Sequence, residues 1–146
     1  MSTEKANESE ALADQLHSAA IHLLRKLRRE DAASGLNAPR LSALSVVVFA
    51  GPVTLGDLAA AEQVRPPTMT RIVDALAKQG LVVKKKNAQD ARSTLIHATA
   101  AGKKLLIQGR ERRVRALAAQ IAVLDSEERK SLAHGAEVLR RVIAAI

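Results

Sequence analysis

The sequence contains no cysteine, no tryptophan and no tyrosine, and Phe49 is its one phenylalanine. Without cysteine the chain can form no disulfide, no thiolate nucleophile, no thiol redox sensor and no cysteine-ligated zinc or iron–sulfur site. The shortage of aromatic rings argues against a cofactor cavity lined by them. Apolar residues nevertheless make up 47% of the 146 residues, which is enough to bury the core of one compact domain. We therefore expect closely packed aliphatic helices.

Long hydrophobic runs and catalytic motifs are missing as well. The longest apolar stretch, residues 41–50, is too short for a transmembrane helix of roughly 20 residues, and the amino terminus lacks the order of a secretory signal. We therefore expect a cytoplasmic protein with no membrane partner. No glycine-rich phosphate loop, Ser/His/Asp arrangement or carboxylate pair stands out, so we expect no enzyme and no cofactor. We also expect no metal site, because His17 and His22 have the wrong helical spacing for a shared ion.

The net charge of +8 is distributed unevenly along the chain. Residues 1–40 carry six basic and six acidic side chains, and residues 41–50 carry none. Residues 51–104 carry nine basic against four acidic side chains, and residues 105–146 carry eight against five. The positive excess therefore begins after residue 50. Such a concentration attracts polyanions, although charge alone more often marks a solvated basic surface.

Two helices are predicted in the amino-terminal part. Aliphatic residues recur at spacings of three or four, which predicts a long amphipathic helix from about residue 9 to residue 33. We expect residues 1–8 to be a disordered tail. Pro39 begins a second predicted helix, which runs through Phe49 and ends at the Gly-Pro pair that follows.

The centre of the chain predicts a helix-turn-helix. A capping box at residues 54–57 begins a short helix to Glu62, and Pro66-Pro67 begin a second helix that ends at Gly80. The apolar stripe that we expect to face the core consists of Met69, Ile72, Val73 and Leu76. The opposite, mostly polar face carries Pro67, Thr70, Arg71, Asp74 and Lys78. A second helix with such a face fits the DNA major groove.

A β-hairpin is predicted directly after this helix. Residues 81–83 and 93–96 are β-prone runs, and the polar segment between them contains turn formers. That segment runs from Lys84 to Arg92 and gives the hairpin a basic tip. The hairpin completes a winged helix-turn-helix, whose basic wing can lie along a minor groove or a phosphate backbone.

Two further helices are predicted in the carboxy-terminal part. Thr99 caps a helix that runs to about Leu124, and a second capping box at residues 125–128 begins the last helix. Both helices carry heptad-like apolar seams. Long helices that flank a small winged domain cannot all bury such seams within one subunit, so we expect a homodimer.

Several short motifs match one known pattern: Leu58-Ala59, Val64, Thr68-Met69-Thr70-Arg71, Leu76, Gly80-Leu81-Val82, Asp90-Ala91-Arg92-Ser93, Thr99 and Gly102. In these residues, and in the order of two helices, winged domain and two helices, nearly the whole chain resembles the MarR-type bacterial transcription regulators. The resemblance implies a dimer with interleaved terminal helices. It also implies recognition helices in successive major grooves and wings that reach the flanking minor grooves.

The resemblance implies roles for individual residues. Thr68, Thr70 and Arg71 would face the operator. Arg92 would enter the minor groove, and Asp90 would orient the wing by pairing with an arginine. The spacing of these two residues agrees, because a carboxylate in a turn can hold a guanidinium two residues away by a charge-assisted bond.

Two positions depart from the family pattern. Arg65 stands where a small capping residue is common, so we expect the recognition helix to lose an N-cap worth about 1 kcal/mol and to gain a phosphate contact. Ala91 replaces a frequent second arginine, which weakens the expected wing contact. The triple lysine at residues 84–86 offers partial compensation.

The predicted fold class is mainly α with a small β wing. A winged helix-turn-helix DNA-binding domain at 51–98 lies between amino-terminal helices at 9–50 and carboxy-terminal helices at 99–146, and both sets of helices are expected to serve dimerisation. The residues expected to bind DNA are Arg65, Pro67, Thr68, Thr70, Arg71, Lys78, Lys84, Lys85, Lys86, Asp90 and Arg92.

The leading functional hypothesis is a homodimeric repressor that binds a pseudo-palindromic operator in double-stranded DNA. In the family, small anionic or phenolic molecules often bind between the winged domain and the dimerisation helices. The resemblance therefore leaves room for a small-molecule effector, and Phe49, His17 and His22 lie on helices that could line its site. The alternative is an architectural or protein-interaction module that binds without sequence preference, which the exposed Asp74 favours.

Overall fold

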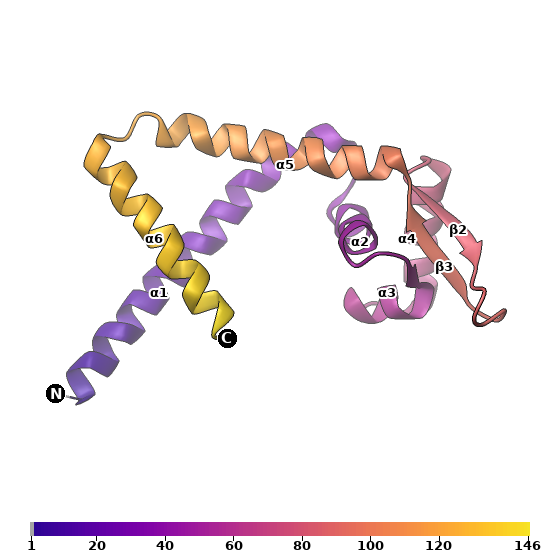
Figure 1. Ribbon diagram of the computed structural model, residues 1–146, viewed down its shortest axis with the longest axis horizontal. Helices are drawn as coiled ribbons and strands as arrows, with labels where there is room; N and C mark the ends of the chain where they lie inside the picture. The colour runs from indigo at the N-terminus through magenta and orange to yellow at the C-terminus, as the bar shows by residue number, and fades with distance from the viewer. Residues whose placement is uncertain (1) are drawn as a thin grey trace.

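The computed structural model describes residues 2–146, with side chains described from Lys5 onward. A winged domain lies at one end of the molecule, two long helices extend away from it, and a third begins at the far end of one of these (Figure 1). The elements in chain order are α1 (Ser2–Leu27), the 3-10 helix η1 (Arg28–Ser34), α2 (Ala38–Phe49), β1 (Val53–Thr54), α3 (Leu55–Ala61), α4 (Pro66–Lys78), β2 (Val82–Lys86), β3 (Thr94–Ala98), α5 (Ala100–Ile121) and α6 (Ser126–Ala144). The predicted fold class is confirmed.

The amino-terminal helix is longer at its start than expected. Helix α1 begins at Ser2 rather than near residue 9, so the predicted disordered tail is wrong for residues 2–8. Glu, Lys and Ala, which are strong helix formers, make up four of the seven residues of this segment. The predicted start rests on the first residues of the apolar stripe, but a helix can begin before its apolar stripe does.

The same helix also ends earlier than expected. Helix α1 stops at Leu27, and a 3-10 helix continues to Ser34. Gly35 follows with a φ of 71°, a left-handed conformation that glycine adopts without steric cost. Asn37 then caps α2 by accepting a hydrogen bond from the Arg40 amide at 3.1 Å. The chain therefore turns sharply between α1 and α2.

The buried apolar side chains that the structure describes all lie between Leu36 and Leu106. They come from α2, α3, α4, the sheet, the first half of α5 and the segments just before α2 and β2. The sheet has the order β1-β3-β2 and is antiparallel throughout, with Val53 opposite Ile96 and Lys84 opposite the same residue on the other side. The winged domain therefore has a complete core of its own.

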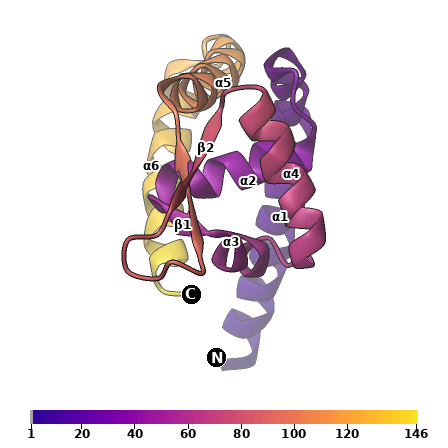
Figure 2. The ribbon, with the colours of Figure 1, turned by 90° about the vertical axis from the view of Figure 1, so that its right-hand side faces the viewer.

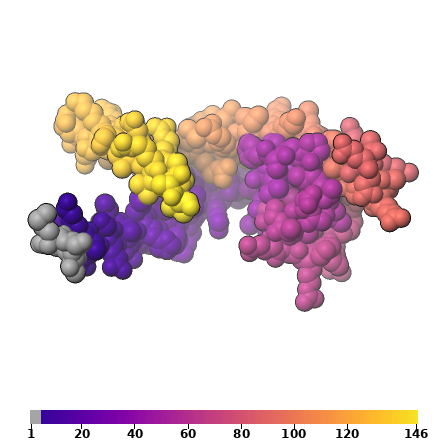
Figure 3. Space-filling view, turned by 60° about the horizontal axis from the view of Figure 1, so that its bottom comes forward, coloured from indigo at the N-terminus to yellow at the C-terminus, as the bar shows by residue number. Residues whose placement is uncertain are grey.

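The long helices outside this core expose apolar residues. None of the residues in α6, all of which the structure describes, is buried, and Ile143 is 61% exposed. Leu12 of α1 and Val123 after α5 are likewise exposed, at 66% and 80%. In the space-filling view, the terminal helices form extended arms, whereas the winged domain is a compact block (Figure 3).

No single helix within the described residues is long and apolar enough to cross a membrane. The helical segments on either side of Gly35 satisfy that criterion only as a pair, with a bend of 88° between them.

Helix α5 begins in close contact with the segment that joins α4 to the wing. The Thr99 hydroxyl donates to the Gly80 carbonyl at 2.6 Å and accepts from the Gly102 amide at 3.1 Å. The Thr99 amide donates to the Leu81 carbonyl at 3.1 Å. A β-carbon on Gly102 would overlap with that Leu81 carbonyl oxygen and lie 3.2 Å from Leu44 Cδ1. Glycine is therefore required for the close approach of the two segments.

We expect Gly102→Ala to destabilise the fold by about 1–3 kcal/mol, because backbone atoms must move to admit the methyl group. Gly135→Ala is the matched control, since an added β-carbon in α6 meets nothing within 4 Å. The control should be neutral or stabilising by up to about 1 kcal/mol, as expected for glycine to alanine in a helix. The measurement is urea unfolding of both variants, and equal effects would contradict the proposed overlap.

Candidate nucleic-acid interface

The helix-turn-helix is built from α3 and α4. Thr54 caps α3 by accepting from the Asp57 amide at 3.1 Å, and its hydroxyl donates to the Asp57 carboxylate at 2.8 Å. The turn after α3 contains Gln63 with a φ of 54°, a conformation that the sequence did not reveal. The Val64 amide then donates to the Ala59 carbonyl at 3.0 Å. These bonds fix the angle at which α4 leaves the turn.

Helix α4 turns its apolar side inward, as predicted. Met69, Val73 and Leu76 are buried, and Ile72 is half-buried against the same core. The exposed face carries Pro67, Thr68, Arg71, Asp74 and Lys78. This polar face is therefore open to solvent.

Thr70 lies at the border of that face. It is half-buried, and its hydroxyl donates to the Pro66 carbonyl at 3.0 Å. Because its one proton is used within the helix, Thr70 presents a methyl group and an acceptor oxygen outward. Thr68, by contrast, is fully on the exposed side.

The start of α4 lacks a side-chain cap, as expected, but the consequence differs from the prediction. Arg65 occupies the N-cap position and makes no capping hydrogen bond. The next two residues are prolines, which have no N–H, and the Thr68 amide donates to the Arg65 carbonyl at 3.0 Å. No donor therefore remains for a capping side chain, and the expected loss of about 1 kcal/mol does not apply here.

The wing is an antiparallel hairpin of β2 and β3, in which Lys86 lies opposite Thr94. The three lysines at residues 84–86 lie in β2 and not at the hairpin tip, which corrects the prediction. Antiparallel pairing extends through them because β2 is an edge strand of the sheet, where exposed lysines are tolerated and discourage edge-to-edge association. Side chains alternate along a strand, so Lys84 and Lys86 share one face with Val82, and Lys85 points to the other.

Lys84 is engaged within the protein. Its ammonium forms an ion pair with the Asp74 carboxylate of α4, and both side chains remain partly exposed, at 41% and 55%. Lys85 and Lys86 have no carboxylate within ion-pair distance among the residues described from Lys5 onward. The three neighbouring lysines, predicted as equivalent DNA contacts, are therefore in different environments.

The turn at the tip of the wing is organised by hydrogen bonds of its polar residues. The Asp90 carboxylate accepts from the Arg92 backbone amide at 3.0 Å. The expected pairing of Asp90 with a guanidinium is therefore wrong, because a backbone N–H two residues away is nearer than the end of a long side chain. Asn87 donates to the Ser93 hydroxyl at 2.9 Å, a contact that the sequence analysis missed. Arg92 itself is exposed.

Helix α4 and the wing lie on the same end of the winged domain. In Figure 2 the wing turn and the amino-terminal end of α4 both point downward, with α3 between them. The exposed side chains on these elements include Arg65, Thr68, Arg71, Lys85, Lys86 and Arg92. The structure thus brings most of the predicted DNA-binding residues to one end of the domain.

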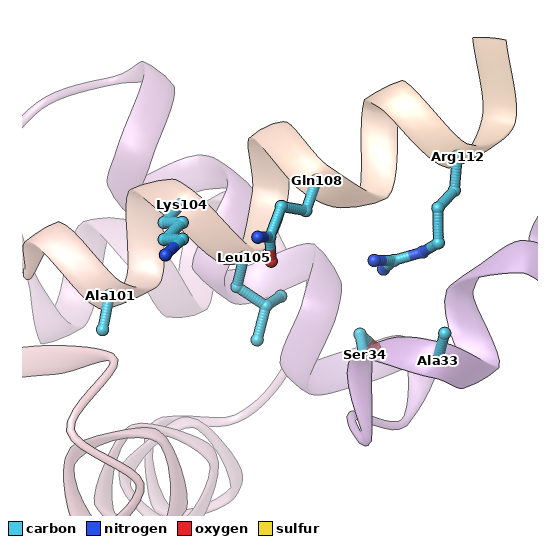
Figure 4. A pocket seen from close by; sticks show the side chains of 7 residues that line it. All are labelled: Ala33, Ser34, Ala101, Lys104, Leu105, Gln108 and Arg112. Carbon is cyan, nitrogen blue, oxygen red and sulfur yellow. The ribbon is translucent and has the colours of Figure 1, made fainter. Parts of the chain in front are cut away.

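A pocket of about 250 Å³ lies between η1 and α5 (Figure 4). Its lining residues are Ala33, Ser34, Ala101, Lys104, Leu105, Gln108 and Arg112. Arg112 Nε donates to the Glu30 carbonyl at 3.4 Å, and Arg113 pairs with Asp31 at 3.6 Å, so α5 is held to η1 beside the pocket. Phe49, His17 and His22 are not among the lining residues, and Phe49 is 78% exposed. Within residues 5–146, no His, Asp and Glu residues form a group of three suited to a metal ion.

The fold and this exposed helix-and-wing surface define a winged helix-turn-helix regulator of transcription. The MarR family model matches residues 36–94. An HTH-type transcriptional regulator of Mycobacterium tuberculosis is 34% identical over 132 residues, which cover 90% of this chain and 92% of that protein. The chain therefore belongs to the MarR family of DNA-binding transcription regulators.

Solved structures share the fold at low sequence identity. A transcriptional regulator of Thermotoga maritima, Tm0710, superimposes with a TM-score of 0.84 at 19% identity, covering 93% of this chain and 96% of that chain. A variant of MepR from S. aureus, bound to an oligodeoxyribonucleotide, superimposes with a TM-score of 0.71 at 18% identity, covering 92% and 98%. The winged arrangement is therefore common to proteins whose sequences have diverged widely.

The two helix starts of the helix-turn-helix give a direct stability test. Thr54→Ala should lower the free energy of unfolding by about 1 kcal/mol, because α3 loses a real N-cap. Arg65→Ser should change it by less than about 0.5 kcal/mol, since no amide is free for the new hydroxyl. Both values come from urea unfolding. A stabilisation near 1 kcal/mol in Arg65→Ser would show that a helix amide was unsatisfied after all.

Proposed function

We propose that this chain is a homodimeric repressor that binds a pseudo-palindromic operator in double-stranded DNA. The observation that carries the proposal is the presence of two different surfaces at opposite ends of the molecule (Figure 1). At one end, the polar face of α4 lies beside a basic wing, and at the other end the terminal helices expose their apolar residues. One surface suits DNA and the other suits a second copy.

In this proposal α4 enters the major groove. Thr68 and Arg71 have free donors that can reach base edges, and Arg71 suits the guanine acceptors O6 and N7. Thr70 can offer only its methyl group and its oxygen to a base, because its proton is held by Pro66. Pro67 makes apolar contact at the start of the helix, where the rigid Pro66-Pro67 pair fixes the approach of the backbone.

The wing and the ends of α4 supply the contacts to the DNA backbone. Arg92 enters the minor groove, and Asp90 assists by fixing the turn from which Arg92 projects. Lys85 and Lys86 on the wing, and Arg65 and Lys78 at the two ends of α4, neutralise phosphates. Such contacts position the protein but carry no sequence information of their own.

The terminal helices form the dimer interface. They expose aliphatic residues on α1, α5 and α6, including Leu12, Leu24, Val114, Leu132 and Ile143. A monomer would leave these apolar side chains in water, whereas a two-fold dimer can bury them in both copies. A dimer also places two copies of α4 so that they can enter successive major grooves, about 34 Å apart.

A small anionic effector can act through the pocket between η1 and α5. Two cationic side chains, Lys104 and Arg112, line that pocket together with the hydrogen-bonding groups of Ser34 and Gln108. A carboxylate on an aliphatic body suits this lining, because no aromatic residue is available for stacking. A molecule bound there touches both α5 and η1 and can change the spacing of the two recognition helices.

The DNA-binding proposal is tested by selecting fragments from a random duplex library with the full chain. We expect one enriched inverted repeat with half-site centres about 10 base pairs apart. Flat enrichment would support the alternative of an architectural or protein-interaction module instead. Affinity for the selected site should fall steeply with salt, with about 0.9 added to the logarithmic slope for each phosphate contact.

Two substitutions separate base reading from backbone contact. Arg71→Ala should lose about 1–3 kcal/mol of discrimination at one position of each half-site, because a base contact disappears. Arg92→Ala should weaken binding to cognate and mismatched DNA alike and lower the salt slope by about 1 per protomer. Fluorescence anisotropy at several salt concentrations measures both. Identical effects on specificity would contradict this division of roles.

The dimer is tested by light scattering coupled to size exclusion. We expect the native chain to have twice the mass of its 15.6 kDa subunit. Ile143→Glu should shift it toward the monomer, because it places a charge in the apolar interface. Phe49→Glu is the matched control, since Phe49 is also exposed and apolar but lies on the winged domain. If both variants stay dimeric, the interface does not include this part of α6.

A further inference from the structure

Helix α4 carries one acidic residue, Asp74, and it lies in the middle of the exposed polar face. Arg71 precedes it by three residues and Lys78 follows by four, so all three share one side of the helix. A carboxylate in this position approaches DNA phosphates and is repelled by them. On a surface that only needed to attract DNA, any neutral residue would serve better.

The structure shows how this negative charge is held. The ammonium of Lys84 reaches from β2 back to α4 and contacts the Asp74 carboxylate. The pair is solvent-accessible, and 55% of the Asp74 side chain remains exposed. Lys84 therefore offsets the repulsion and fixes the orientation of Asp74 without covering it.

The position of Asp74 along α4 places it among residues that can reach bases. In the homeodomain recognition helix, the base-reading residues follow the spacing i, i+3, i+4 and i+7. Counting from Pro67, the same spacing on α4 selects Thr70, Arg71 and Asp74. Thr70 and Arg71 are already proposed to face the operator, and Asp74 completes the row.

The chemistry of a carboxylate restricts what it can recognise. It accepts hydrogen bonds and donates none, so it suits the N4 amino group of cytosine. Guanine presents two acceptors and thymine one acceptor in the major groove, and these repel a carboxylate. The donor of Arg71, one turn away, has the complementary preference for guanine.

We propose that Asp74, held in place by Lys84, is a specificity-determining residue that reads a cytosine amino group in the major groove and disfavours other sequences. This inference rests on the proposed sequence-specific binding of DNA. It assigns Lys84 a different role from Lys85: Lys84 positions a base-reading group, whereas Lys85 contacts phosphate. It also explains why an acidic residue on this face is compatible with DNA binding.

The test compares full-length variants by selection from the random duplex library and by anisotropy on the selected site. Asp74→Ala should erase the cytosine preference at one position per half-site and weaken cognate binding roughly 5- to 100-fold. Its affinity for scrambled DNA should rise, with a steeper salt slope, because Lys84 becomes free to contact phosphate. Asp74→Asn should move the preference at that position from cytosine to adenine, because an amide pairs with N6 and N7 of adenine.

The two lysines of the wing form the matched comparison. Lys84→Gln should weaken the cytosine preference, because Asp74 is no longer held in place. It should also weaken binding to every sequence more than Lys85→Gln does, because the Asp74 charge is then unneutralised. When Asp74→Ala is already present, Lys84→Gln and Lys85→Gln should have equal effects. Thermal melting checks that the variants remain folded, and only small shifts are expected from an exposed ion pair.

The outcomes separate this inference from the proposed function. If the native chain selects no inverted repeat, the proposed operator binding fails, and this inference fails with it. If the native chain selects a repeat and Asp74→Ala and Asp74→Asn both leave its base preferences unchanged, only the reading role of Asp74 is overturned. The inference is supported if Asp74→Ala loses the preference for cytosine at that position and Asp74→Asn gains a preference for adenine there.

Discussion

The close contact between the start of α5 and the Gly80-Leu81 segment is the constraint on which the rest of the structure depends. Gly80 ends α4 in a left-handed conformation with a φ of 72°, and Leu81 leads directly into β2. The Thr99 hydroxyl and amide bind both residues, and Gly102 packs against the Leu81 carbonyl. Three elements with different tasks therefore meet within a few residues: the recognition helix, the wing and the long helix that leaves the domain. None can move far without displacing the other two.

This junction lies between the buried core of the winged domain and the helices that expose apolar side chains. The buried core lies between Leu36 and Leu106, on the winged side of the junction. Beyond it, α5 and α6 expose apolar side chains such as Val114 and Ile143. The winged domain therefore has a core of its own, whereas in the proposed dimer its position relative to a second copy would depend on α5. Because α5 is a continuous helix from Ala100 to Ile121, the direction of its first turn determines where its far end lies.

The sequence predicted the elements far better than the contacts between them. Caps at Thr54, Thr99 and Asp125, the apolar stripe of α4 and the β-prone runs of the wing are local signals, and the structure confirms each. The contact between Asp74 and Lys84 joins two elements, and periodicity says nothing about which way a surface lysine points. The Asp90 prediction failed because a nearby backbone amide competes with a guanidinium, and the start of α1 was missed because helix formers without an apolar stripe give no periodic signal.

The pocket between η1 and α5 was beyond sequence analysis for the same reason, yet its location relative to the junction is informative. Ala101 and Lys104 line the pocket and lie on either side of Gly102. Gly102 packs so closely against the Leu81 carbonyl that not even a β-carbon would fit between them. Arg112 and Arg113 hold the next turns of α5 to η1. A molecule that pushes η1 away from α5 therefore acts on a helix whose first turn is fixed to both α4 and the wing. The small displacement cannot be absorbed at Gly102, so it must appear as a change in the direction of α5 or in the placement of the whole winged domain. In the proposed dimer, either change would alter the separation of the two recognition helices, so a ligand in this pocket would act on DNA binding without touching the DNA-binding surface.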